Sequence, residues 1–190
     1  MSKNYIENEE FIGINFSETE LDKGDYEKCF FINCNLSNTD LSSINFIECQ
    51  MDNCDLSLAR LTNTAFREVH FKNCKLVGLH FENCNPFLFS ISLLGCRLNL
   101  SSFYKCKMPK IQLKDCDLSE VDFTEAILND GIFNNCDLSG AIFDKTRLEK
   151  ADFRSAYNYS INPETNHIKK AKFSVVGIIG LLDKHDLVIE

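Results

Sequence analysis

Large apolar residues recur at every fifth position along most of the chain. One series begins at Phe11 and continues without a miss to Phe81. It fails at Pro86, and a second series begins two residues out of step at Leu88 and continues to Phe153. A period of five fits neither the 3.6-residue repeat of an α-helix nor the two-residue repeat of a β-strand. The pattern predicts a chain that turns a corner every five residues and points one large side chain inward each time.

A second series, of small residues, lies two positions before the large one. All ten cysteines of the chain belong to it: Cys29, Cys34, Cys49, Cys54, Cys74, Cys84, Cys96, Cys106, Cys116 and Cys136. The residue between the two series is often Asp or Asn, and the residue after the large one is often Ser, as in Cys54-Asp55-Leu56-Ser57. We expect the small residue to pack inside the fold beside the large one.

These segments resemble the motif of the pentapeptide-repeat family, approximately A(D/N)LXX. Two near-ideal copies are Cys116-Asp117-Leu118-Ser119-Glu120 and Ala151-Asp152-Phe153-Arg154-Ser155. The resemblance covers residues 11–155 and implies an all-β fold, a right-handed quadrilateral parallel β-helix with four pentapeptides per coil. Residues 1–10 are then a lead-in, residues 11–157 form about seven coils, and residues 158–190 form a small cap with a helix and a strand.

If four segments make one coil, residues 20 apart stack on one another. One column of large residues is then all leucine: Leu36, Leu56, Leu76 and, after the two extra residues, Leu98, Leu118 and Leu138. The small residues beside it form a ladder of six core cysteines: Cys34, Cys54, Cys74, Cys96, Cys116 and Cys136. Because both columns continue across Pro86, residues 85–87 are predicted to hold a local bulge rather than a domain boundary.

So many cysteines also raise two other interpretations, a disulfide framework and a metal site. Stacked coils separate equivalent sulfurs by about 4.8 Å, well beyond the ~2.05 Å of a disulfide bond. A linear column also does not converge tetrahedrally, as the ligands of a structural zinc ion must. The cysteine ladder is therefore predicted to be packing, and no cofactor or metal is expected.

Catalytic signals are weak. The four histidines are His70, His80, His167 and His185, and none stands in a Ser/His/Asp arrangement. Phosphate-binding glycine motifs do not occur in the sequence. A filled interior also leaves no cleft of the kind that active sites occupy. We expect a protein that is not an enzyme and whose function lies on its surface.

Charge divides the chain into three bands. Residues 1–66 carry 4 basic and 12 acidic residues, residues 67–114 carry 8 and 2, and residues 115–190 carry 8 and 14. Stacked coils turn this into an acidic rod with a basic waist. Such fields steer association, although ordinary solubilising charge is the alternative. Because the waist contains the bulge, the candidate partner contacts are Phe87, Phe89, Arg97, Lys105 and Lys110, with Leu88 pointing inward.

The C-terminal segment departs from the repeat. Residues 170–173 alternate as in a short strand, and Ser174 can cap a helix that continues to Lys184. Within this helix, Gly177 and Gly180 would permit a close approach to a neighbour. A second short strand is expected at residues 187–189. Its apolar surface either only caps the rod or forms a homodimer interface; the candidate interface residues are Val175, Ile178, Ile179, Leu182, Leu187 and Ile189.

This ending resembles one branch of the family, the quinolone-resistance (Qnr-type) and microcin-immunity proteins. The residues that carry the resemblance are Ile161-Asn162-Pro163-Glu164, Asn166 and Ile168. The resemblance implies a tail-to-tail dimer that mimics duplex DNA, binds DNA gyrase or topoisomerase IV, and protects the enzyme from a quinolone or a peptide toxin. It implies no direct contact with nucleic acid. The alternative is a structural scaffold that binds another protein through its basic waist.

The sequence also bears on location. No run of 18 apolar residues is present, and Met1 to Glu10 is polar. We therefore expect a cytoplasmic protein without a membrane segment.

Overall fold

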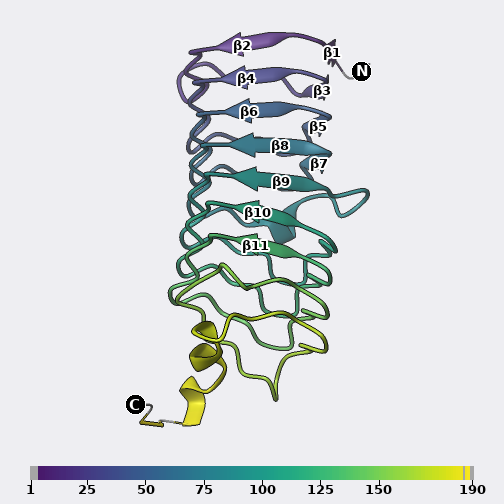
Figure 1. The fold of residues 1–190 in the computed structure, drawn as a ribbon. Helices are drawn as coiled ribbons and strands as arrows, with labels where there is room; N and C mark the ends of the chain where they lie inside the picture. The colour runs from purple at the N-terminus through teal and green to yellow at the C-terminus, as the bar shows by residue number, and fades with distance from the viewer. Residues whose placement is uncertain (1–3, 186, 189–190) are drawn as a thin grey trace.

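The computed structural model describes residues 4–185 and 187–188 and shows a parallel β-solenoid (Figure 1). One sheet has the order β1-β3-β5-β7, with β1 at Asn4–Glu7, β3 at Gly24–Glu27, β5 at Asn45–Ile47 and β7 at Ala65–Arg67. A second sheet has seven strands, namely β2 (Glu10–Ile12), β4 (Phe30–Ile32), β6 (Gln50–Asp52), β8 (Val69–Lys72), β9 (Ile91–Leu94), β10 (Gln112–Lys114) and β11 (Ile132–Asn134).

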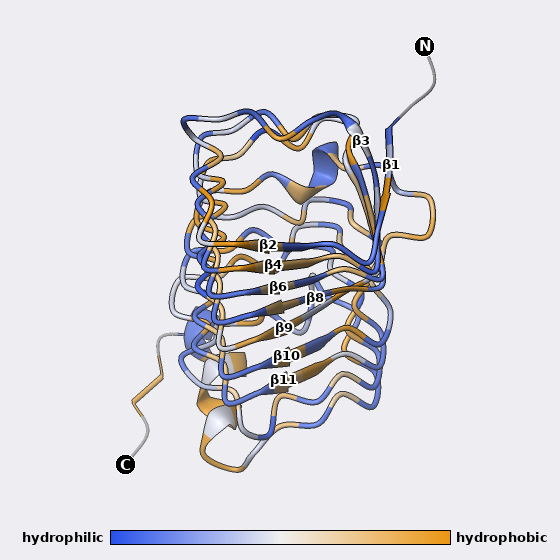
Figure 2. Ribbon diagram, turned by 90° about the horizontal axis from the view of Figure 1, so that it is seen from above, coloured by the Kyte–Doolittle hydropathy of each residue, from blue (hydrophilic) through white to orange (hydrophobic). Residues whose placement is uncertain are grey.

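The pairing register confirms four pentapeptides per coil. Asp25 pairs with Asn45, and Gln112 pairs with Ile132, both 20 residues on. Between β8 and β9 the step is 22, since Val69 pairs with Ile91. The two extra residues are thus absorbed within a single coil. In the second view, β2 to β11 follow one another in order along one side of the solenoid (Figure 2).

Four faces follow one another around each coil. Face 1 contains the sheet β1-β3-β5-β7 and continues lower down through the bridges Lys107↔Ile127↔Arg147↔His167. Face 2 is the seven-stranded sheet, which is extended by the bridges Ile132↔Asp152 and Asp152↔Lys172. Face 3 is a column of bridges from Asn15 to Tyr157, and face 4 is a column that includes His80↔Ser102↔Asp122↔Ile142.

The corners depend on residues with a positive φ angle. Asn33, Asn53 and Lys105 are examples, with φ of 54°, 54° and 57°. This left-handed conformation strains residues other than Gly, and Asn and Asp tolerate it best. Side chains also brace the corners from within: the Asp117 carboxylate accepts hydrogen bonds from the backbone N–H and the hydroxyl of Ser119 at 3.1 and 2.6 Å. The Asp-Leu-Ser segments of the sequence are therefore turn-forming units.

The interior is filled by the two series that the sequence predicts. All six leucines of the column on face 3 are completely buried. Phenylalanine rings stack in a neighbouring column, with centroids 4.4 Å apart for Phe81 and Phe103 and 5.5 Å apart for Phe103 and Phe123. Because the rungs stack side chain on side chain, each large residue is packed by the coils above and below it.

The small series supplies hydrogen-bond donors as well as space. The Cys54 thiol donates to the Phe31 carbonyl of the previous rung at 3.3 Å. The Thr64 hydroxyl makes the equivalent bond to Leu41 at 2.8 Å, and Ser101 does so to Leu76 at 2.6 Å. Burial raises the pKa of the Cys49 thiol to about 12. Nine of the ten cysteines are buried, and Cys106 alone is half-buried.

Two boundaries of the repeat differ from the sequence pattern. Strand β1 lies within residues 1–10, the expected lead-in, and pairs with β3, so the first coil begins earlier than Phe11. The inward assignment of Leu88 is wrong, because its side chain is 65% exposed and its φ is 56°. Leu88 forms a corner, Phe89 is half-buried against Phe81, and the large series resumes at Leu93.

The C-terminal segment also differs in its elements. In place of an α-helix there are two 3-10 helices, η2 (Gly177–Leu181) and η3 (Asp183–His185). Residues 170–173 form a corner and one bridge, Asp152↔Lys172, rather than a strand, because the repeat geometry extends this far. Leu187 lies in no strand, and Ile189 falls outside the described residues. Ser174 does cap the turn, accepting the Gly177 N–H at 3.0 Å.

Candidate interaction surfaces

One rung of face 1 lacks its ladder hydrogen bonds. In this column the Ile127 N–H bonds to Cys106 O and the Arg147 N–H bonds to Ala126 O, both at 2.9 Å. The matching bond from the Lys107 N–H to Cys84 O is absent in the described structure, and the carbonyl of Lys107 has no backbone donor either. Pro86 stands where that donor would be and has no N–H. The 3-10 helix η1 (Phe81–Asn83) lies just before Pro86, and there the Asn83 N–H donates a hydrogen bond to His80 O.

A pocket of about 430 Å³ opens at this missing rung. Its walls contain Phe81, Glu82, Cys84, Pro86, Phe89, Tyr104, Lys105, Cys106 and Lys107. Cys106 is partly exposed in the wall of this pocket, whereas Cys84 of the coil above it is buried. Burial raises the pKa of the Cys106 thiol to about 12. Glu82 Oε1 lies 2.9 Å from His80 Nδ1, whereas Glu82 Oε2 is buried without a hydrogen-bond partner in the structure described.

The loop that follows Pro86 projects from the stack just before β9 (Figure 1). Asn85 Oδ1 accepts the Phe87 N–H at 2.9 Å and fixes the turn. Phe87 is 64% exposed, and the Arg67 guanidinium lies over its ring at 5.3 Å from the centroid. Together with Leu88, this places two large apolar side chains in solvent beside a cation.

The predicted partner contacts do not all come together. Phe89 and Lys105 line the same pocket, with Lys105 Nζ 4.7 Å from the Tyr104 ring centroid. Phe87 projects from the loop, and Lys110 occupies the next corner of the same coil as Lys105. Arg97 lies on face 3, in the bridge column between Lys75 and Asp117, and belongs to another side of the rod.

Sequence reasoning missed Arg67, Tyr104, Cys106 and Lys107 as parts of this surface. Pro86 was the available signal, because a proline in the ladder position removes a rung donor.

Opposite charges pair mostly along columns, one rung apart. Lys72 lies 2.8 Å from Asp52, and Lys105 lies 3.6 Å from Glu125. Such exposed pairs contribute about 1 kcal/mol at most. Within the described residues, no ion pair within 4 Å involves the waist cations Arg97, Lys107, Lys110 and Lys114. These four side chains of the waist therefore remain positively charged without a carboxylate in direct contact.

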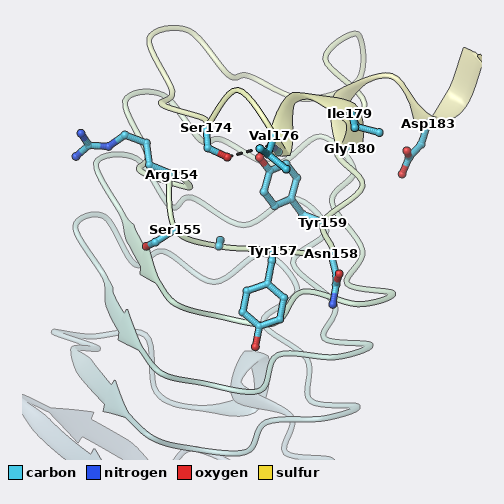
Figure 3. Close-up of a pocket in the computed structure, with 12 residues that line it drawn as sticks. Arg154, Ser155, Tyr157, Asn158, Tyr159, Ser174, Val176, Ile179, Gly180 and Asp183 are labelled. Atoms are coloured by element: carbon cyan, nitrogen blue, oxygen red, sulfur yellow. Dashed lines mark hydrogen bonds between the residues drawn. The ribbon is translucent and has the colours of Figure 1, made fainter. Parts of the chain in front are cut away.

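The C-terminal cap packs on Tyr159, which lies beneath η2 (Figure 3). Tyr159 is 4% exposed and contacts Phe153 and Phe173, with ring centroids 5.8 and 5.7 Å away. A Cβ atom at Gly177 or Gly180 would collide with Tyr159, which confirms that these glycines permit a close approach. Burial raises the pKa of Tyr159, whose hydroxyl has no hydrogen-bond partner in the described part of the chain.

The outer side of the cap is apolar and exposed. Val175 is 90% exposed and Val176 is 82% exposed. Ile178, Ile179 and Leu187 are about half exposed, whereas Leu182 is partly buried. In the single chain, this apolar side of the cap is therefore left uncovered. No helix among residues 4–185 is long and apolar enough to cross a membrane.

Repeat number, rung register and corner geometry define a pentapeptide-repeat β-solenoid. Family profiles agree: one for the pentapeptide repeat region matches residues 24–103, and one for eight copies of the repeat matches residues 116–154. The chain belongs to the pentapeptide-repeat family. No curated protein sequence is significantly similar to it.

Two solved structures are similar over nearly the whole chain. QnrB1, described as a plasmid-mediated fluoroquinolone resistance protein, has a TM-score of 0.64 and 16% identity, covering 97% of this chain and 100% of its own. HetL of the cyanobacterium Nostoc, described as involved in heterocyst differentiation regulation, has a TM-score of 0.61 and 20% identity, covering 92% of this chain and 90% of its own. At these identities the likeness shows the shared fold.

Proposed function

We propose that this protein binds a type II topoisomerase, DNA gyrase or topoisomerase IV, as a rod-shaped mimic of duplex DNA, without catalysing a reaction. By binding, it protects the enzyme from a quinolone or a peptide toxin. Its similarity in fold to a fluoroquinolone resistance protein, over 97% of this chain and 100% of that one, supports the proposal. The observation that carries it is the charge density of the N-terminal coils.

Residues 4–66 carry 12 acidic and 3 basic residues. At 20 residues per coil and about 4.8 Å per rung, they occupy roughly 15 Å of the rod. This amounts to about one net negative charge per 2 Å, close to the one per ~1.7 Å of duplex DNA. Glu9, Glu18 and Glu20 are exposed members of this set. The basic waist interrupts the acidic surface, so the proposed mimicry lies in the coils before it.

A supercoiling assay with DNA gyrase tests the proposal. The protein is expected to inhibit supercoiling at high concentration or to restore it in the presence of ciprofloxacin. Exchanging Glu9, Glu18 and Glu20 for Gln should weaken the effect, because it removes charge without removing a packed side chain. The matched control exchanges the waist residues Lys110 and Lys114 for Gln. Absence of binding, inhibition and protection would remove the proposal.

The proposal includes a homodimer through the exposed apolar side of the cap. Val175, Ile178 and Ile179 present the surface, and Ile189 extends the predicted interface beyond the described residues. Burying such groups against a second copy is favourable at about 25 cal/mol per Å². Light scattering at micromolar concentration should give twice the chain mass, and Ile178→Asp should give the monomer. A monomeric mass for the unaltered protein contradicts this part.

A scaffold that binds another protein through the waist is the second candidate. The stack of Arg67 on the exposed Phe87 favours it, because aromatic and arginine side chains are enriched in interfaces. Reversing the charge of Arg97, Lys105 and Lys110 to Glu discriminates the two functions. A waist scaffold should then lose its partner, whereas gyrase binding should persist or strengthen.

A further inference from the structure

We infer that the outer edge of the first coil, formed by β1 and β2, is a docking site for an extended, basic peptide segment of a partner protein. The segment adds one further rung to the N-terminal end of the solenoid. The inference goes beyond the topoisomerase proposal and does not depend on it. It rests on backbone groups that face away from the solenoid, on core side chains that the first coil leaves partly uncovered, and on the charge of that coil.

Strands β1 and β2 are the outermost strands of their sheets and lie at the N-terminal end of the rod (Figure 1). Among the described residues, β1 pairs with β3 alone and β2 pairs with β4 alone. No further coil of the described chain stacks on their outer side. A strand can therefore add here without two existing rungs having to separate.

The pairing register shows which backbone groups of β2 face outward. In each pair of a parallel ladder, one residue directs both its N–H and its C=O at the neighbouring strand, and its partner directs both away. In the pair of Glu10 with Phe30, Phe30 supplies the bonds, because its N–H donates to Glu9 O at 2.9 Å. The N–H and C=O of Glu10 therefore point away from the solenoid.

Two more residues of the edge are in the same position. Ile12 is one, because its partner Ile32 directs its carbonyl at β2 and accepts the Gly13 N–H at 2.8 Å. On β1, Glu7 stands in the same relation to its partner Glu27. The edge thus offers alternating donors and acceptors along both strands, and addition of a strand to such an edge is a common mode of peptide recognition.

The first coil also leaves its part of the core partly uncovered. Phe11 and Ile6 are only partly buried. Their partners in the next coil, Phe31 and Tyr26, are 0% and 2% exposed. Successive side chains of an added strand point to opposite sides, so every second one would face inward. An apolar residue at such a position would cover Phe11 as each coil covers the next.

The charge of the first coil determines what kind of strand fits. Residues 4–20 carry 5 acidic residues and no basic one. Within the described residues, no ion pair within 4 Å involves Glu9, Glu10, Glu18 or Glu20. A second copy of the chain would bring the same charge to the edge, so repulsion opposes the pairing of two copies there. Lysine or arginine at the outward positions of an added strand complements these carboxylates.

Ile12→Pro separates strand addition from the fold. It removes an N–H that faces outward, and proline is tolerated in an edge strand at such a position. The bond from the Gly13 N–H to Ile32 O is kept. Ile12→Thr is the matched control, because it keeps the N–H and the β-branched shape of a side chain that is already exposed. Glu10→Gln removes one charge and keeps the N–H.

The probe is a rhodamine-labelled peptide, Lys-Leu-Lys-Leu-Lys, with both ends blocked, and binding is measured by fluorescence anisotropy. One matched probe is methylated at the central backbone nitrogens. A second has the order Lys-Lys-Lys-Leu-Leu, which keeps the charge and abolishes the alternation. A third replaces Lys by Asp.

Saturable binding of the basic alternating peptide is expected. It should be roughly tenfold weaker for the N-methylated and reordered peptides and for Ile12→Pro, because each loses backbone hydrogen bonds or the covered core position. Ile12→Thr should bind like the unaltered protein, and Glu10→Gln should bind between the two. Equal binding of the N-methylated or the Asp peptide, unchanged binding to Ile12→Pro, or no binding of the basic alternating peptide would overturn the inference.

The melting temperature checks that the Ile12 N–H is unpaired. Ile12→Pro should melt close to the unaltered protein, whereas Phe30→Pro, which removes the bond to Glu9 O, should melt lower. Equal falls would show that the Ile12 N–H is already bonded, and the inference would fail.

Light scattering decides between a peptide and a second copy as the occupant. It is measured on Ile178→Asp, in which the proposed cap interface is disrupted. The expected mass is that of the monomer. A dimer that the further change Ile12→Pro converts to the monomer would show that the edge pairs with another copy, and the inference would be wrong.

Discussion

Faces 1 and 3 are built from the same five-residue repeat, yet one has a break and the other does not. On face 3 the ladder crosses the insertion without interruption, since Lys75 pairs with Arg97 and Arg97 with Asp117. On face 1 the column stops at the rung of Asn85 and resumes at Lys107. Both faces cross the same two-residue insertion, so the insertion alone does not remove ladder hydrogen bonds.

The difference lies in where the insertion and Pro86 fall. Each coil contacts only the coils beside it, so a local defect need not spread. The loop after Pro86 leaves the stack at the corner between faces 1 and 2, and β9 rejoins β8 through four paired residues. Among the described residues, ladder bonds are therefore lost locally, between Asn85 and Lys107 on face 1 and between Arg60 and His80 on face 4, while face 3 stays paired from Asn15 to Tyr157.

The largest expected contrast concerns two phenylalanines on the two sides of this defect. Phe103 is fully buried and stacked on both neighbours, whereas Phe89 is half-buried at the open rung. Phe103→Ala should lower the free energy of unfolding by about 3–5 kcal/mol. Phe89→Ala should lower it by much less, as measured by urea denaturation. Equal losses would mean that the open rung is packed as tightly as the closed wall.

Proline substitutions in one column give the next largest contrast. Ile127→Pro removes a ladder bond and leaves the Cys106 carbonyl without a donor, at an expected cost of about 1–3 kcal/mol. Lys107→Pro removes no bond and should leave the thermal midpoint nearly unchanged. Calorimetry of both variants measures the difference. A midpoint lowered equally by the two would show that the column is continuous.

The cysteines should differ in reactivity in the same way. The thiols of Cys49 and Cys106 both have pKa values raised to about 12 by burial, so both are thiols at pH 8. Reaction with iodoacetamide needs the thiolate and access. Cys106, which is partly exposed, should therefore be alkylated before the fully buried Cys49. Peptide mass spectrometry over a time course gives the order, and earlier labelling of Cys49 would contradict the structure.

The smallest effect concerns the carboxylates of face 3. Burial alone would raise the pKa of Asp117, but hydrogen bonds from Ser119 and Asn99 and the charge of Arg97 hold it below its usual value. A lowered pKa in the folded state contributes stability above the unfolded pKa of about 3.9, and this is lost as pH falls through the folded value.

Asp117→Asn keeps the turn acceptor and removes the titration. Its unfolding free energy should therefore fall less steeply below pH 4 than that of the unaltered protein. Equal slopes in acid denaturation would show that Asp117 does not contribute.

The sequence predicted the features that depend on periodicity. The five-residue series defined the core, the 20-residue columns defined the coil, and the continuity of the cysteines located the insertion. It wrongly predicted that Leu88 points inward, because Leu88 and Phe89 are both large and the loop has no repeat to fix its register. The sequence also predicted an α-helix and a strand in the C-terminal segment, where the structure has 3-10 turns. Gly177 and Gly180 are there because the chain packs closely on Tyr159, which a helix pattern does not reveal.

The loss of ladder hydrogen bonds between Asn85 and Lys107 could have been predicted from the sequence, but it was not. Pro86 stands at a position where the next coils place Met108 and Leu128, whose N–H groups donate to Ile127 O and Arg147 O at 2.8 Å. Recognising it requires knowing which N–H of the repeat enters the ladder, and that follows from three-dimensional register rather than from hydrophobicity.

Amide hydrogen exchange along face 1 tests the central claim most directly. The N–H groups of Ile127 and Arg147 are ladder donors and should exchange only on local or global opening. The N–H of Lys107, by contrast, should exchange at close to the rate of an unprotected amide. Protection of Lys107 equal to that of Ile127 would contradict the account, because the wall would then be closed where the structure has it open.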